Sequence, residues 1–127
     1  MIATAVPMHE AFASVKTPEE FGYMLRDFLD RFREHPSSSL IGEEPDPLAQ
    51  SLDDSGVADA YLAATAAWLA NRDRLPVPAW AKGGSRALDL PWFAASSHKL
   101  RMLLLQESPT EFRIRNLFIS ADALSRA

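Results

Sequence analysis

The stretch VADAYLAATAAWLANR, residues 57–72, decides how the rest of the chain folds. Its larger apolar side chains recur with the 3.6-residue period of an α-helix. They are Val57, Tyr61, Leu62, Trp68 and Leu69. Alanine occupies many of the other positions, which widens the apolar face and lets neighbouring helices approach closely. We therefore predict a central helix from Val57 to about Arg72.

A helix before this stretch is predicted from its start signal. Thr17 provides a hydroxyl N-cap, Pro18 suits the first helical position, and Glu20 completes a capping box. The residues that follow place one apolar stripe on the helix: Phe21, Met24, Leu25, Phe28, Leu29 and Phe32. We expect the helix to end at His35, because Pro36 follows it.

The N-terminal segment and one glycine have more than one interpretation. Residues 1–16 form either an N-terminal arm or a short helix, since Met8 and Phe12 are spaced for one helical face. Gly22 lies inside the predicted helix, where it costs about 1 kcal/mol relative to alanine. We interpret it as a place where another backbone approaches. Residues 17–127 are predicted to form a single helical domain.

Turn and capping signals organise the connections around the central helix. We expect Asp46 to cap a short helix that ends near Leu52. After the central helix, Pro76 and Pro78 exclude a long helix but allow one helical turn from Pro78. The connections on both sides of the central helix are therefore predicted to be irregular.

The C-terminal part is predicted to hold two helices. Either Ser96 or Ser97 caps the first, which runs to about Gln106. Its predicted core stripe is Leu100, Leu103 and Leu104. A second capping box, from Ser108 to Glu111, should open the other helix. The fold class is therefore predicted to be all-α: a compact bundle of about five helices with irregular connections rich in proline and tryptophan.

The composition is typical of a soluble cytoplasmic protein. The 127 residues include no cysteine, which excludes disulfides and thiolate nucleophiles and suits a reducing compartment. The first fifteen residues lack a basic start and include Glu10, so no signal peptide is predicted. No apolar run reaches the roughly 20 residues needed to cross a bilayer. We expect a cytoplasmic protein that makes no membrane contact.

Charge is divided unevenly along the chain. Residues 1–63 hold 4 Lys or Arg and 12 Asp or Glu, whereas residues 64–127 hold 9 and 5. This division favours either a face that binds a polyanion or two halves that attract each other within one fold. The second interpretation is favoured, because the basic residues are scattered among leucines. The basic set is Lys99, Arg101, Arg113, Arg115 and Arg126.

The sequence contains no recognisable catalytic or metal-binding arrangement. His9, His35 and His98 lie far apart and none has a second ligand at helical spacing, so no metal is expected. Gly83 and Gly84 follow no predicted strand and lack the Lys-Ser pair of a phosphate-binding loop. We therefore predict no catalytic residue, no cofactor and no metal, and we do not expect an enzyme.

Aromatic and arginine residues in the C-terminal half are the candidates for a protein interface. Tryptophan and arginine are enriched at the energetic centres of interfaces. The candidate residues are Trp80, Trp92, Arg101, Arg113 and Arg115. The predicted partner is another protein. A homodimer and nucleic-acid binding are both left open.

The same half carries motifs that resemble a known family. In order they are LPxPAW (75–80), PWF (91–93), LRxLLL (100–105), ESPxxFRxRNLFI (107–119) and DALSRA (122–127). They are similar to a bacterial antitoxin-like domain, which often follows an Xre-type helix-turn-helix and is encoded beside nucleotidyltransferase-type toxins. The match covers about residues 57–127. Residues 1–56 depart from the longer relatives, because they contain no recognisable helix-turn-helix.

The resemblance implies a role through a partner. It implies a non-catalytic protein-binding domain that neutralises or regulates a toxin encoded nearby, and it carries over no catalytic residue. The alternative is a nucleic-acid-associated transcriptional regulator that uses the basic C-terminal half. The missing helix-turn-helix and the net charge of −4 weigh against this alternative.

Overall fold

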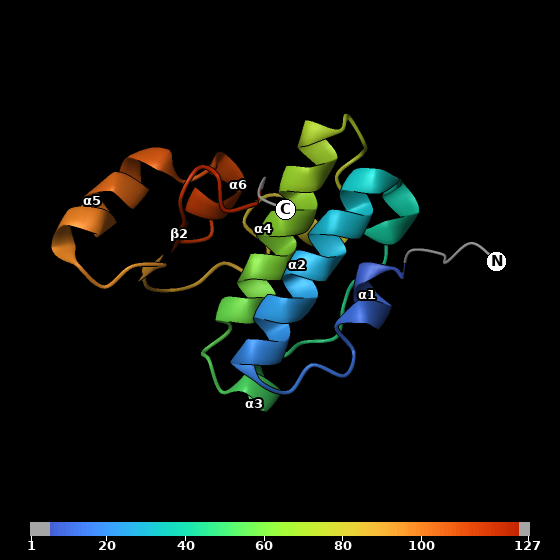
Figure 1. Ribbon diagram of the computed structural model, residues 1–127, viewed down its shortest axis with the longest axis horizontal. Helices are drawn as coiled ribbons and strands as arrows, with labels where there is room; N and C mark the ends of the chain where they lie inside the picture. Colours follow the sequence, from blue (N-terminus) through green and yellow to red (C-terminus); the bar gives the residue numbers. More distant parts are fainter. Residues whose placement is uncertain (1–5, 125–127) are drawn as a thin grey trace.

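Residues 57–72 form the central helix, as predicted. In the computed structural model, which describes residues 6–124, helix α4 spans Val57–Arg72. Most of its alanines are buried, and with Leu62 and Leu69 they lie in the middle of the hydrophobic core. The other elements are arranged around α4 (Figure 1). The all-α prediction is confirmed, since the structure is 51% helical and 3% strand.

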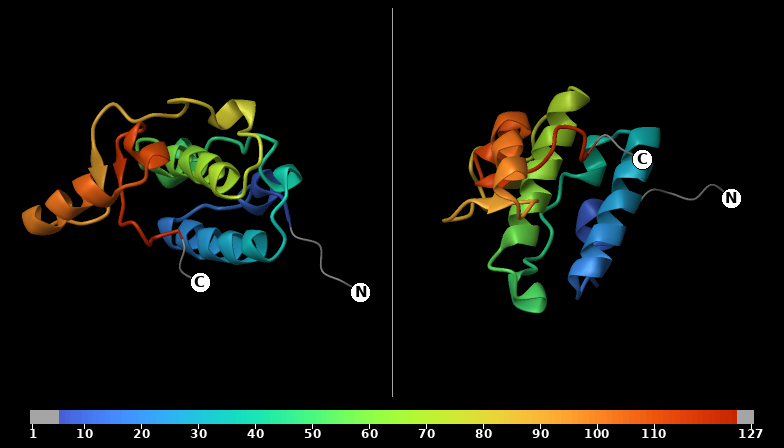
Figure 2. Two further views of the ribbon diagram at one scale, coloured as in Figure 1. Left: turned by 90° about the horizontal axis from the view of Figure 1, so that it is seen from above. Right: turned by 60° about the vertical axis from the view of Figure 1, so that its left-hand side comes forward.

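Helix α2 spans Pro18–Glu34 and starts with the predicted capping box. The Thr17 hydroxyl accepts a hydrogen bond from the Glu20 amide at 3.1 Å, and the Glu20 carboxylate accepts one from the Thr17 amide at 3.2 Å. Helices α2 and α4 lie side by side and run in the same direction (Figures 1 and 2). Phe21 packs edge-on against Tyr61 between them, with the ring centroids 6.1 Å apart.

The N-terminal segment contains a short docked helix. Helix α1 spans Met8–Ala11 and lies beside α2 (Figure 1). Met8 and Phe12 are buried in the core, and the Phe12 ring lies 5.5 Å from that of Phe21. Of the two interpretations of residues 1–16, the short helix therefore describes residues 6–16. Residues 1–5 lie outside the described residues.

Helix α3 spans Ala49–Leu52, and its start is held by a residue of α4. The Asp59 carboxylate accepts hydrogen bonds from the amides of Leu48 and Ala49, at 2.7 and 3.2 Å. The predicted cap, Asp46, is exposed, and α3 has no side-chain cap of its own. The short helix was predicted correctly, but its cap comes from across the fold.

The C-terminal part contains the remaining elements. They are α5 (His98–Glu107), α6 (Thr110–Arg113), β1 (Trp92–Phe93) and β2 (Leu117–Phe118), besides 3-10 helices at Ser38–Leu40 and Ala79–Ala81. The two strands pair in parallel, with Trp92 opposite Leu117. Helix α6 packs on α4, whereas α5 packs mainly on β2 and projects from the body at the left of Figure 1.

Two predictions for this part are wrong. Leu100 and Leu103 are 50% and 45% exposed, so the predicted core stripe of α5 is reduced to Leu104. Ser108 does not cap α6. Its hydroxyl donates to the Leu117 carbonyl at 2.9 Å and accepts from the Ile119 amide at 3.3 Å. This hydroxyl therefore fastens the end of α5 to β2, a pairing that no local signal indicates.

Gly22 does not mark a close backbone approach. A Cβ atom added there would meet, among the described residues, only the Nη1 atom of Arg26, at 3.9 Å. We therefore expect Gly22→Ala to raise the free energy of unfolding by about 0.5–1 kcal/mol, because alanine loses less backbone entropy in a helix. Urea denaturation measures this. Gly56→Ala is the control: its φ is +90°, so the change should destabilise. Destabilisation by Gly22→Ala would contradict the prediction.

Candidate functional site

Arg115 lies in the core and not at the surface. Its side chain is fully buried, and its guanidinium donates hydrogen bonds to the carbonyls of Ser85, Glu111 and Ala81, at 2.8, 2.6 and 2.7 Å. Burial lowers the pKa of Arg115, and the nearby Glu111 carboxylate opposes that shift. A buried side chain has no surface to offer a partner, so we withdraw Arg115 from the candidate interface.

Trp80 and Arg86 join the two halves of the chain. The half-buried Trp80 donates its indole N–H to the Ile41 carbonyl at 2.9 Å. The Arg86 guanidinium lies over the Trp80 ring, 5.1 Å from its centroid, and pairs with Glu44 at 2.9 Å. This ion pair is an attraction between the acidic and basic halves within one fold. Trp80 is therefore part of the internal packing.

The basic set does not form one described patch. Arg115 is buried, and Arg126 lies outside the described residues. Arg113 is exposed, but its guanidinium donates to the Ser108 carbonyl at 3.0 Å, just beyond the end of α5. Lys99 and Arg101 remain, both exposed on the first turn of α5. Among the described residues of the set, the nucleic-acid alternative thus rests on three exposed cations, Lys99 and Arg101 on α5 and Arg113 on α6.

Besides the exposed Arg113, the candidates placed beside open surface are Trp92 and Arg101. The Arg101 guanidinium lies over the Phe93 ring, 5.3 Å from its centroid, and donates to the Ala95 carbonyl at 3.1 Å. Trp92 is half-buried on β1 and lines a groove. The structure therefore places Arg101 on one feature, the projecting helix α5, and Trp92 on another, the groove.

Helix α5 exposes most of its apolar side chains. Leu100, Met102, Leu103 and Leu105 are 50%, 48%, 45% and 41% exposed, and we call these four residues the α5 surface. Successive residues of an α-helix point about 100° apart, so these four lie on different sides of α5. A helix that is apolar all round is normally buried. Within one copy of this chain, only one of its leucines, Leu104, is buried.

The sequence contained a signal for this surface that the search for a stripe missed. Residues 102–105 are four consecutive apolar residues, and four consecutive positions cover every side of a helix. By contrast, the stripe of α2 is interrupted by charged residues at positions such as Arg26 and Asp27, and that helix buries one face. A single core stripe of Leu100, Leu103 and Leu104 describes a helix that buries one face, as α2 does, and α5 is not such a helix.

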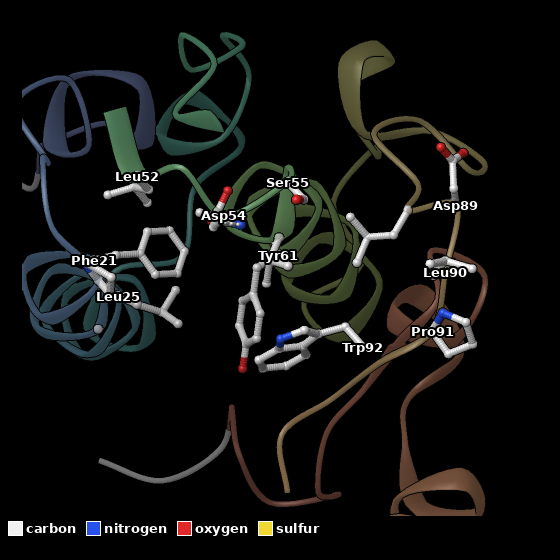
Figure 3. A pocket seen from close by; sticks show the side chains of 15 residues that line it. Phe21, Leu25, Leu52, Asp54, Ser55, Tyr61, Asp89, Leu90, Pro91 and Trp92 are labelled. Carbon is white, nitrogen blue, oxygen red and sulfur yellow. Dashed lines mark hydrogen bonds between the residues drawn. The ribbon is translucent and has the colours of Figure 1, made fainter. Parts of the chain in front are cut away.

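A groove of about 870 Å³ opens between α2, the turn before α4, the first turn of α4 and the segment 88–92. Its apolar lining includes Phe21, Leu25, Leu52, Val57, Tyr61, Leu88 and Trp92. Gly22 also lines it, so the absent side chain leaves the groove wider. Figure 3 looks into this groove, with Tyr61 and Trp92 lying next to each other near its middle.

Polar groups lie at the edge of the groove and at its centre. Asp54, Ser55 and Asp89 lie along one edge (Figure 3). The Asp54 carboxylate caps α4 by accepting from the Gly56 and Ala58 amides, at 2.9 and 2.8 Å. Burial raises the pKa of Tyr61 to about 12, so its hydroxyl stays protonated at neutral pH. The groove is thus an apolar trough with an acidic edge.

The described residues hold neither a clustered set of metal ligands nor a membrane-spanning helix. Among residues 6–124, no group of three or more His, Cys, Asp or Glu is placed to hold a metal ion. Within the same range, no helix combines the length and the hydrophobicity needed to cross a membrane. What the chain does present is a protruding apolar helix and an open apolar groove. Both features expose apolar side chains to solvent.

The comparisons with known proteins add no family. The antitoxin-like resemblance rests on the motifs of residues 57–127, and it stays a prediction. Its motif residues take different roles in the fold: Trp80 and Arg115 pack internally, whereas Leu100 and Leu103 are exposed. A scan against protein-family models, a search of curated proteins and a search of solved structures found no match to this chain.

Proposed function

We propose that this chain is a non-catalytic protein-binding domain that binds its partner through the α5 surface. One observation carries the proposal: four large apolar side chains, 41–50% exposed, lie on a helix that projects from the body. Burying apolar surface gains about 25 cal/mol per Å². A partner that covers α5 therefore gains a hydrophobic contact that the domain does not make by itself.

The partner we propose is a toxin encoded by a neighbouring gene, which the domain neutralises or regulates in the cytoplasm. The motif order of residues 57–127 is the support for this choice. The chemistry of α5 defines what the partner surface must offer. It needs an apolar concavity for Leu103 and its neighbours, with a carboxylate at the rim to meet Lys99 or Arg101.

Leu103→Glu should break this complex. A charge placed within an apolar contact loses its water without gaining a partner, so the dissociation constant should rise about 30- to 1000-fold, equivalent to about 2–4 kcal/mol. Co-expression with the neighbouring gene product, followed by affinity purification and calorimetric titration, measures it. The unbound variant should keep its helical circular dichroism, because position 103 is 45% exposed.

Gln106→Glu is the matched control for this experiment. It introduces the same charge at an exposed polar position of the same helix, and it should bind normally. Equal losses with both variants would indicate a general charge effect and not a specific contact. A neighbouring gene product that neither co-purifies with the wild-type chain nor loses toxicity beside it would refute the proposed partnership.

A further inference from the structure

We propose that two copies of this chain associate reciprocally, with α5 of each copy seated in the groove of the other. The inference goes beyond the proposed function, because it concerns a second surface and a second copy of the same chain. It starts from two complementary features of one molecule that do not meet in a single copy: an apolar helix and an open apolar groove, both of which the described residues leave exposed to solvent.

The dimensions of the two features agree. Helix α5 has 10 residues. A helix of that length is about 15 Å long and about 10 Å across, so half of such a cylinder occupies roughly 600 Å³. The groove offers about 870 Å³ and is open to solvent. It can therefore receive one face of α5, with the rest of the helix remaining outside.

The chemistry of the contact surfaces also agrees. The α5 surface consists of three leucines and one methionine. The groove is lined by Leu25, Leu52 and Val57 and by the half-buried ring of Trp92. Methionine and leucine side chains adapt readily to aromatic and aliphatic walls. Seating α5 there removes apolar surface from water in both copies.

Charge gives the seated helix a direction. The first turn of α5 contains His98, Lys99 and Arg101 and no acidic residue, although the positive end of a helix dipole favours acidic neighbours. The groove has Asp54 and Asp89 along one edge. The exposed Asp89 carboxylate has no partner among the described residues. The acidic edge of one copy therefore supplies what the first turn of α5 in the other copy lacks.

The geometry favours exchange between two copies over closure within one. Helix α5 is fastened at its end by Ser108, whose hydroxyl bonds to β2, and it lies apart from α2 (Figures 1 and 2). Two copies related by a twofold axis would make the same contact twice. Such an interface closes on itself and stops at the dimer.

The test uses one variant on each side of the contact. Gly22→Phe places a ring in the groove, because Gly22 lines it and a Cβ atom there meets, among the described residues, only Arg26 Nη1 at 3.9 Å. Leu103→Glu disables the α5 surface. Sedimentation velocity over a concentration series should give a dimer for the wild type and a monomer for each variant. Glu34→Phe, which adds the same ring at the exposed far end of α2, should stay dimeric.

Mixing the two variants makes the test specific. Gly22→Phe retains a working α5 and Leu103→Glu retains a working groove, so their mixture should form a heterodimer through the one intact contact. Circular dichroism and thermal melting confirm that both variants are folded. A wild type that is monomeric throughout the series, or a folded Gly22→Phe that remains dimeric, would overturn the inference.

The two proposals can fail separately. A dimeric wild type that captures no neighbouring gene product retains this inference and removes the proposed function. A monomeric wild type that captures the partner, and loses it with Leu103→Glu, retains the proposed function and removes this inference. If both hold, the partner and the second copy compete for α5, and Gly22→Phe should bind the partner more tightly than the wild type does.

Discussion

Arg115→Met should lower the free energy of unfolding by about 3 kcal/mol, whereas Arg113→Met should cost less than about 1 kcal/mol. The Arg115 guanidinium serves three carbonyls with hydrogen bonds of 2.6–2.8 Å, in a place without solvent. Methionine fills similar space but leaves those carbonyls unpaired. The exposed Arg113 has water as a substitute partner.

Two opposing effects determine how much Arg115→Met changes the free energy of unfolding. Burial of the guanidinium is costly, as its lowered pKa indicates, and methionine removes that cost. Hydrogen bonds to a charged group are each worth about 1.5–3 kcal/mol, so three of them outweigh it. Urea denaturation followed by tryptophan fluorescence measures the difference. A variant as stable as the wild type would mean that desolvation cancels the three bonds.

Asp59→Ala should lower the free energy of unfolding by about 2–4 kcal/mol. The carboxylate is 9% exposed, holds the amides of Leu48 and Ala49, and lies 3.8 Å from an Arg86 nitrogen that has no hydrogen-bond partner. Removing it leaves two amides without their acceptor, and it takes from the mostly buried Arg86 the second of its two carboxylates, the other being Glu44 at 2.9 Å.

Asp46→Ala is the matched control for the Asp59 prediction. Asp46 is the cap that the local sequence predicts for α3, but it is exposed, so its loss should change stability by no more than about 0.5 kcal/mol. Thermal and urea denaturation of the two variants in parallel measure both values. If Asp46→Ala lowered the free energy of unfolding more than Asp59→Ala does, Asp46 would be the cap of α3, and the role of Asp59 would be contradicted.

Local signals predicted the elements that depend on neighbouring residues. The bounds of α4 and the capping box of α2 follow from hydrophobic period and cap chemistry within a few residues. The cap of α3, the position of Arg115 and the pairing of β1 with β2 depend on residues 10 or more positions apart. A period or a cap motif contains no information about such contacts.

For the same reason, the sequence predicted only part of the candidate site. The sequence does not show whether an arginine lies at the surface or in the core, so it could not distinguish Arg113 from Arg115. Their burial depends on which carbonyls the fold brings near, and those belong to residues 81 and 85 as well as to α6. The apolar run of α5 was visible, but its exposure depends on how little of the fold packs over it.

The hydrogen bonds around Arg115 and Asn116 also determine how the domain opens. The amides of Leu88 and Trp92 donate to the carbonyls of these two residues, and the Asn116 side chain donates back to the Leu88 carbonyl. Several hydrogen bonds therefore connect the irregular segment 81–94 to residues 115–118. We expect the two segments to separate as one cooperative unit. Since α5 lies in sequence between these two segments, both of its ends are attached to this hydrogen-bonded unit, and we expect α5 to lose its fixed orientation when the unit opens.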